Sequence, residues 1–458
     1  MSWFAGWRAL AALALLKLAV SFFLFGLGFH GVSDDDFARI VIAQDFAHSP
    51  KLDPSGTSWL PLPFWITGGA MMLLGYSPSV AVGVGVALGV LSVWLVYAAA
   101  RRFFDDDESA FWGAALVAVL PWSARLGASA LPELPVAAAA LFAIVSLTRS
   151  SARARLAGSV LLLAACLSRY EPWFLAVGFA AYCLWGARKR DDARGANVAC
   201  AAVALAGPIA WSAWNAHAHG SPTHYLDRVA AYKQAIDQGA IAERVTSYFL
   251  AVFRAEPELI GALAFLVWVL RGSHRVEVVR AKRPLILLGV LLLTLTASSI
   301  KGGAPTHHPE RALLTLHLFL AIVTAHLAAT ARRAGLLVPQ HVVAAMIVIG
   351  GGVATLRGTL LFKESVAHRE AELAVGREVA ARVPPGERVY LEVVDYGYFA
   401  VMAASGRPWD FVLSGKVDPA RGGEVLGEAR VRARAAEQGL THAVGLQSEA
   451  RYTLWSAP

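Results

Sequence analysis

This sequence has few charged residues and few cysteines, and it has no nucleotide-binding motif. Only 16% of its 458 residues are Asp, Glu, Lys or Arg, whereas 57% are hydrophobic. A soluble domain has about 25% charged residues, so this composition is that of a membrane protein. The three cysteines (Cys166, Cys183 and Cys200) all lie in apolar segments, which provides neither a disulfide framework nor a zinc-binding spacing.

Three further absences narrow the class of protein. The chain has neither a P-loop nor the glycine fingerprint of a dinucleotide-binding fold. It has no internal repeat, a feature that many transporters show. Its first apolar run lacks the small-residue cleavage site of a signal peptide, so we expect that run to be a retained membrane span.

Apolar runs long enough to cross a bilayer recur along the chain. We predict about eleven spans, at residues 8–29, 79–100, 109–127, 134–149, 156–168, 172–186, 197–215, 247–270, 285–300, 311–330 and 337–356. Every second connection is basic, as at Arg101, Arg188 and Arg332. By the positive-inside rule, this pattern predicts a cytoplasmic N-terminus and an extracytoplasmic C-terminus. These basic loops also account for much of the net charge of +8, so a nucleic-acid partner is not needed to explain it.

Two segments are expected outside the bilayer on the outer side. "WLPLPFWITGGAMMLLG" at 59–75 holds two prolines, and a full crossing there would invert every later loop. We therefore predict interfacial helices within an outer loop at 30–78. Residues 357–458 alternate helical stretches with short strand-like ones. The sequence thus predicts an α-helical polytopic membrane domain at 1–356 and a small extracytoplasmic α/β domain at 357–458.

Charged residues at membrane depth are costly and tend to be functional, and here they gather on the outer side. They are Asp34, Asp35, Asp36, Glu133, Arg169, Glu171, Lys301, His307, His308, Glu310 and Arg311. Each also has a purely structural explanation. Ser33 and Asp36 fit a helix capping box, and Arg169 with Glu171 fits an ion pair. Their common location is the stronger indication of a site.

The order of these features resembles that of the GT-C superfamily of polytopic glycosyltransferases. The motifs, in order, are "DDDFARIVIAQDFAHSPKL", "WLPLPFW", "AARRFF", "ASALPELPVAAAALFAIVSL", "LLAACLSRYEPWFLAVGFAAY" and "HHPERALLTLHLFLA". The chain is most similar to the branch that contains protein O-mannosyltransferases and the aminoarabinose transferase of lipid A. This resemblance covers roughly residues 8–330. The segment 357–458 resembles the variable periplasmic domains that such enzymes append.

The resemblance also implies roles for individual residues. An acidic pair in the first outer loop of the superfamily holds the catalytic base, and its spacing places the pair on Asp35 and Asp36. The second residue is Asp here rather than Glu, and Asp34 precedes the pair, so the base within the triplet stays open. Glu133 corresponds to a second acidic residue. Donor-phosphate ligands are expected at Arg311, His308, His307, Arg169 and Lys301. The substrate cavity is expected to include Trp59, Tyr170, Glu171 and Glu310.

The chemistry of such a reaction agrees with these residue types. A carboxylate would deprotonate or orient an acceptor hydroxyl, and cations would stabilise a phosphate leaving group. We therefore expect an inner-membrane hexosyl- or pentosyltransferase. It would move a sugar from a polyprenyl-phosphate donor to an extracytoplasmic protein, lipid or glycan, with inversion implied by the resemblance. No cofactor is certain, although Asp34 to Asp36 offer oxygen ligands to Mg²⁺ or Mn²⁺. The alternatives are a transporter or flippase of a lipid-linked or anionic solute and a non-catalytic scaffold.

Overall fold

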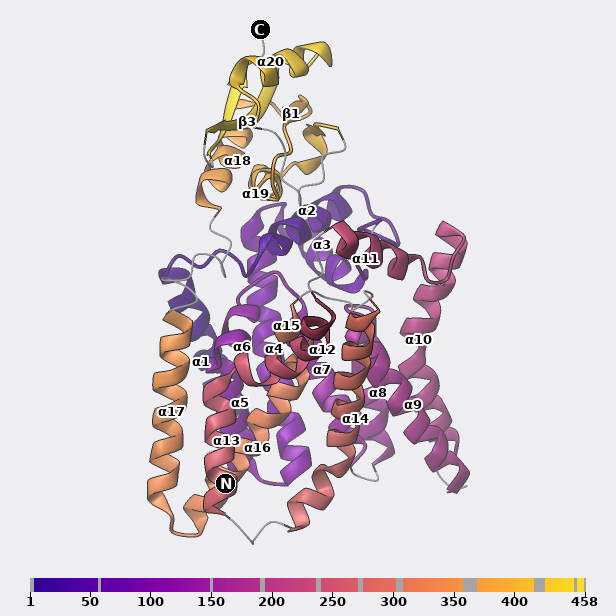
Figure 1. Ribbon diagram of the computed structural model, residues 1–458, viewed down its shortest axis with the longest axis vertical. Coiled ribbons are helices and arrows are strands. Elements are labelled where there is room, and N and C mark those ends of the chain that lie inside the picture. Colours follow the sequence, from indigo (N-terminus) through magenta and orange to yellow (C-terminus); the bar gives the residue numbers. More distant parts are fainter. Residues whose placement is uncertain are drawn as a thin grey trace.

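A bundle of long helices carries a small domain on one of its ends (Figure 1). The computed structural model describes residues 4–56, 59–148, 151–189, 194–235, 240–270, 275–301, 308–356, 369–415, 425–448 and 451–456. The N-terminus lies toward the opposite end of the bundle from the C-terminus (Figure 1). Within the described residues, five helices are long and apolar enough to cross a membrane. They are α1 (Trp7–Gly26), α4 (Pro78–Phe104), α10 (Arg194–His219), α14 (Arg275–Ile300) and α16 (Leu314–Arg333).

Further helices belong to the bundle. They are α5 (Asp107–Val119), α6 (Pro121–Leu126), α7 (Glu133–Ser146), α8 (Ala152–Cys166), α9 (Glu171–Lys189), α12 (Ile241–Arg254), α13 (Pro257–Val269) and α17 (Leu337–Leu356). Two further helices, α11 (His224–Ala235) and α15 (Pro309–Ala312), lie near the end that carries the small domain (Figure 1). Each of the eleven expected spans therefore coincides with one helix or with a pair of consecutive helices.

Two segments expected as single spans are broken helices. The segment 109–127 divides into α5 and α6, and 247–270 falls on α12 and α13. A proline disfavours helical geometry in the residue before it, and Leu120 before Pro121 is accordingly extended, with ψ 136°. Pro121 and Pro257 each stand in the first turn of the second helix, where the missing N–H costs nothing.

The outer loop folds into two helices between the bundle and the small domain (Figure 1). They are α2 (Asp34–His48) and α3 (Leu62–Leu74). The N-terminus of α2 is fixed by Asp36, whose Oδ2 accepts the backbone N–H groups of Val32 at 2.9 Å and Ser33 at 3.1 Å. This is the carboxylate half of a capping box, as the spacing from Ser33 predicts.

The small domain contains a four-stranded sheet with strand order β2-β1-β3-β4. Its elements are α18 (Glu370–Arg382), β1 (Val389–Leu391), α19 (Tyr398–Ser405), β2 (Phe411–Leu413), α20 (Glu428–Glu437), β3 (His442–Ser448) and β4 (Arg451–Ser456). Strand β1 is parallel to β2 and β3, and β4 is antiparallel to β3. Helix α19 and strand β2 are formed by the apolar runs YFAVMAAS and FVL, which stand between turn residues.

The small domain shares a hydrophobic core with the outer loop. Phe37 and Ile40 of α2 belong to the same buried cluster as Val401 of α19. The buried amide of Gln44 donates from Nε2 to the carbonyl oxygens of Tyr76 at 2.7 Å and Ala403 at 2.9 Å. A buried amide with two carbonyl acceptors fixes the register between the two surfaces. The domain and α2 therefore form one packed unit.

Two glycines of α4 bring the loop at 127–132 against that helix. A Cβ atom on Gly85 would lie 2.1 Å from the carbonyl oxygen of Ser129, and one on Gly89 would lie 2.4 Å from that of Gly127. Any side chain at either position would push the loop away. The loop supplies the N–H of Ala130 to Asp36 and leads directly into α7, so this contact helps to position the site.

Candidate active site

The three consecutive aspartates at the start of α2 have three different partners. Asp34 receives two hydrogen bonds from Arg369 of the small domain, at 2.9 and 3.0 Å. Asp35 lies 3.2 Å from Nη1 of Arg311. Asp36 points back into the protein and is buried, with 1% of its surface exposed. Of the three residues expected to hold the base, only Asp35 thus faces the other charged residues of the site.

Asp36 is held entirely by backbone donors. Besides Val32 and Ser33, Ala130 donates its N–H to Oδ1 of Asp36 at 3.0 Å. Burial raises the pKa of Asp36 to about 7, and these N–H groups and the charge of Arg311 act in the opposite direction. The arrangement ties the first turn of α2 to the loop that precedes α7, which is a structural role.

A chain of alternating charges extends from Asp35 into the protein. Oε1 of Glu133 lies 2.5 Å from Nη2 of Arg311 and 2.6 Å from Nη1 of Arg169. Arg169 in turn contacts Glu171 at 2.5 Å, and Arg311 contacts Asp35. The structure therefore brings together five residues that the sequence analysis selected, across as many as 276 positions of the chain.

Helix starts position these acids. Asp35 stands in the first turn of α2, and Glu133 and Glu171 are the first residues of α7 and α9. Acidic residues are favoured there by the positive end of the helix dipole. The side chain of Asp35 is 35% exposed, whereas those of Glu133, Arg169, Glu171 and Arg311 are 0–10% exposed. Asp35 is thus the most exposed member of the network.

The recess beside this network is small as it stands. Its free volume of about 10 Å³ is room for about one water molecule. Its charged lining consists of Glu133, Arg169, Glu171 and Arg311, and apolar residues of α7, α9 and α14 complete the wall. Oε2 of Glu133 is buried and has no hydrogen-bond partner among the described residues.

Arg39 is a site residue that the sequence analysis missed. It is 7% exposed, and its guanidinium lies 4.5 Å from the ring centroid of Trp59 and 5.5 Å from that of Phe64. Its Nε and Nη1 atoms have no hydrogen-bond partner among the described residues. Burial lowers the pKa of Arg39 to about 10, against the opposing charges of Glu133 and Asp35, so it is charged at neutral pH. Its spacing of four residues from Asp35 places both on one face of a helix and was the available signal.

The remaining expected residues lie around this network or apart from it. Trp59 covers Arg39, as described above. The ring of Tyr170 stacks on Tyr225 of α11 at a centroid distance of 4.6 Å, within a separate aromatic group. Lys301 is exposed where α14 ends, and His308 directly precedes α15, which contains Glu310. His307 lies outside the described residues.

The aspartate triplet does not form a cation site in this arrangement. Its three carboxylates point to Arg369, to Arg311 and to backbone N–H groups, so one ion cannot be ligated by all of them. Across the described part of the chain, no group of three or more His, Cys, Asp and Glu side chains gathers as metal ligands. We therefore derive no step through Mg²⁺ or Mn²⁺.

Comparison with known proteins places this arrangement in a known architecture. Residues 54–214 match the family model described as dolichyl-phosphate-mannose-protein mannosyltransferase. The structure of ArnT from Cupriavidus metallidurans bound to undecaprenyl phosphate is similar, with a TM-score of 0.62 and 14% identity. That match covers 90% of this chain and 86% of ArnT. The chain has the GT-C fold.

Two further solved structures share this GT-C fold. The apo state of the same ArnT has a TM-score of 0.61 at 15% identity, over 95% of this chain and 92% of that one. The archaeal oligosaccharyltransferase AglB from Archaeoglobus fulgidus, in complex with an inhibitory peptide and a dolichol-phosphate, has a TM-score of 0.50 at 11% identity. That match covers 97% of this chain and 70% of AglB. No curated protein matches the chain in sequence.

The GT-C fold confirms the resemblance found in the sequence and the expected fold class. The chain is a multi-pass membrane protein with an α-helical bundle. The number of spans and the orientation of the termini stay predictions. So do the roles of the individual site residues, which the geometry above refines.

Proposed function

We propose that this chain is a membrane glycosyltransferase that moves a sugar from a polyprenyl-phosphate-linked donor to an acceptor at the outer face. The GT-C proteins ArnT and AglB, with undecaprenyl phosphate and with dolichol-phosphate and a peptide, support this class of donor and an extracytoplasmic acceptor. One observation carries the proposal. An accessible carboxylate, Asp35, stands beside the buried guanidinium of Arg311 at the end of the bundle that carries the small domain.

In this reaction Asp35 acts as the general base. An acceptor hydroxyl attacks the anomeric carbon, its proton passes to Asp35, and the bond between that carbon and the phosphate oxygen breaks. The negative charge that develops on the leaving phosphate needs fixed cations nearby. Arg311 is 3.2 Å from Asp35, and Arg39 lies one helical turn beyond Asp35 with two unused buried donors.

Glu133 holds the phosphate-binding arginines in place until the donor arrives. In the structure it contacts both Arg169 and Arg311, and the recess between them has room for about one water molecule. A donor phosphate would compete with Glu133 for Arg311, since both are anions that suit a guanidinium. Each arginine has a second acidic partner, but Arg169 contacts Glu171 at 2.5 Å whereas Arg311 contacts the partly exposed Asp35 at 3.2 Å, so Arg311 is the more available of the two.

The rim of the site is assigned by position. Lys301 and His308 would meet the outer phosphate oxygens from the ends of α14 and α15, together with His307. Trp59, Tyr170 and Glu310 would border the sugar and the acceptor. We place this face outside an inner membrane and the N-terminus in the cytoplasm. The support is that Arg101, Arg188 and Arg332 lie at helix ends far from the site, as the positive-inside rule requires.

The test uses purified protein in lipid, a panel of radiolabelled polyprenyl-phosphate sugars and a crude cell-envelope acceptor fraction. Asp35→Asn removes the base with little change of shape, and we expect transfer to fall by about 10²- to 10⁴-fold. Asp45→Asn, on the same helix ten residues away, is the matched control and should stay near the wild-type rate.

Two outcomes would contradict the proposal. Equal transfer by Asp35→Asn and the wild type would place the base elsewhere. A protein that consumes none of the donors, while Asp35→Asn alters uptake or flipping of lipid-linked sugar in vesicles, would favour the transporter reading.

A further inference from the structure

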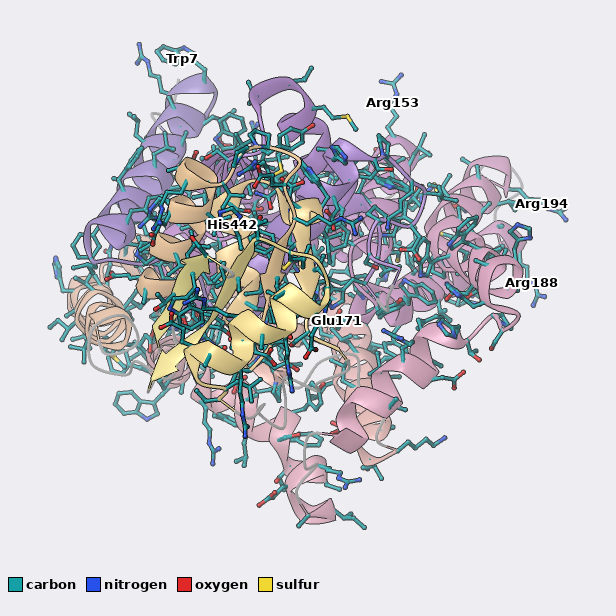
Figure 2. The ribbon with its side chains drawn as sticks, turned by 90° about the horizontal axis from the view of Figure 1, so that it is seen from above. Trp7, Arg153, Glu171, Arg188, Arg194 and His442 are labelled. Atoms are coloured by element: carbon teal, nitrogen blue, oxygen red, sulfur yellow. The ribbon has the colours of Figure 1, made fainter. Side chains whose placement is uncertain are left out.

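A second open groove lies at the end of the bundle opposite the candidate active site. It runs between the C-terminal end of α9 and the N-terminal end of α10, and its free volume is about 590 Å³. The α9 wall includes Leu184, Trp185 and Arg188, and the α10 wall consists of Arg194 and Val198. Figure 2 shows Arg188 and Arg194 on the same side of the outer rim of the bundle.

The groove is part of the packing between the two helices. Behind it, α9 and α10 approach closely, since a Cβ atom on Gly186 would lie 3.2 Å from Nδ2 of Asn197. Asn197 is buried, with 5% of its surface exposed. Small residues of this kind let two membrane helices come into contact along their backbones. The spacing of the two walls is therefore set by the helix pair.

The lining separates apolar from charged groups. Leu184 and Val198 are 44% and 45% exposed, so their side chains are open to the surroundings of the bundle. The two arginines stand nearer the connecting loop. On the α9 wall, the ammonium group of Lys189 lies 4.0 Å from the ring centroid of Trp185.

We propose that this groove binds the phosphate head group of an anionic phospholipid, in the leaflet opposite the candidate active site. The guanidinium groups of Arg188 and Arg194 would donate to the phosphodiester from opposite walls. Trp185 would lie at the level of the head groups, where indole rings are enriched. The first part of an acyl chain would run over Leu184 and Val198. Basic pockets between membrane helices on the cytoplasmic side are typical binding sites of this kind.

The two-walled geometry distinguishes the groove from an ordinary basic helix end. Arg153, at the start of α8, is also exposed and lies near the same end of the bundle. Figure 2 shows Arg153 on another part of the rim, away from Arg188 and Arg194. It is not among the residues that line the groove. A general preference of basic residues for one side of the membrane would act on all three arginines alike, whereas a lipid site needs only the two that line the groove.

The test is native mass spectrometry of the detergent-purified full chain with added phosphatidylglycerol or phosphatidylcholine of identical acyl chains. We expect the wild type to retain phosphatidylglycerol at least tenfold more strongly than phosphatidylcholine. The double variant Arg188→Gln, Arg194→Gln should lose that preference, and Arg153→Gln should keep it. The double variant Arg188→Lys, Arg194→Lys should keep most of it, and a thermal unfolding curve checks that each variant is folded.

Each alternative result overturns the proposal. Equal retention of the two lipids by the wild type would show that no anionic head group is selected. A preference that survives the Gln double variant, or that Arg153→Gln also abolishes, would place the lipid elsewhere. Competition by inorganic phosphate as strong as that by phosphatidylglycerol would mean that the groove takes a free anion instead of a lipid. Transfer activity is not needed for this readout, so failure here is distinct from failure of the proposed function.

Discussion

Replacing Arg369 with methionine tests whether the small domain fixes the start of α2. Arg369 pairs with Asp34 at 2.9 and 3.0 Å, with Glu372 at 2.8 Å and with Asp395 at 2.9 Å. Its side chain is 19% exposed, and the three carboxylates raise its pKa above the usual value even though burial acts against them. With each partly exposed ion pair worth about 1 kcal/mol, we expect a loss of about 2–3 kcal/mol.

Hydrogen exchange at the first turns of α2 and α18 measures this loss locally. A loss of 2–3 kcal/mol corresponds to a fall of about 30- to 160-fold in protection, at 1.36 kcal/mol for each factor of ten. The matched control is Arg382→Met, which removes an exposed pair with Glu378 four residues away and should cost about 0.3–0.5 kcal/mol. A fall of less than threefold in Arg369→Met, or the same fall in both variants, would refute a role for Arg369 in docking the domain.

Two other predictions concern the aspartate triplet. The raised pKa of Asp36 means that the folded state prefers the protonated form. Below about pH 4, Asp36 is protonated in both the folded and the unfolded state, so it makes no pH-dependent contribution to stability. As the pH rises from about 4 to 7, the free energy of unfolding of the wild type should fall relative to that of Asp36→Asn by up to about 1.4 kcal/mol per pH unit. Thermal unfolding of both proteins from pH 4 to 8 measures that difference, and a pH-independent difference would contradict it. Since the three carboxylates do not converge, transfer should survive EDTA. A tenfold loss that Mg²⁺ or Mn²⁺ restores would show that the triplet binds a cation.

Apolar runs and basic loops were sufficient to predict the bundle. A membrane helix makes its backbone hydrogen bonds within itself, so a continuous apolar run is enough to identify it. Pro121 and Pro257 were visible signs that the helices break there. The positive-inside rule did not reveal these breaks, because two consecutive helices that cross the bilayer together leave the loops on the same sides as one helix does. Local spacing likewise predicted the capping role of Asp36 through Ser33. The same spacing argument would have found Arg39, which lies one turn after Asp35.

The ion pairs could not be predicted in the same way. Arg369 and Asp34 are 335 positions apart, and Arg311 and Asp35 are 276 apart. Neither pair has a local signature, since an exposed arginine and an arginine buried against a distant carboxylate look identical in a sequence. The sequence placed the charged residues on one side of the membrane, and thus near one another. Which carboxylate meets which guanidinium depends on the contacts of α2 with the loop before α7, with Arg311 of α15 and with the small domain.

The three aspartates have different partners, and this difference fixes the position of Asp35, the proposed base. Asp34 is fixed by an arginine of another domain, and Asp36 by three backbone N–H groups. Between them, Asp35 lies on a helical turn that is anchored on both sides; its carboxylate contacts Arg311 and is partly exposed. A base held in one geometry before the acceptor arrives loses little entropy at the moment of reaction. In the proposed reaction, the neighbours of Asp35 would contribute to catalysis without touching the substrate, because their contacts keep its carboxylate where an acceptor hydroxyl can reach it.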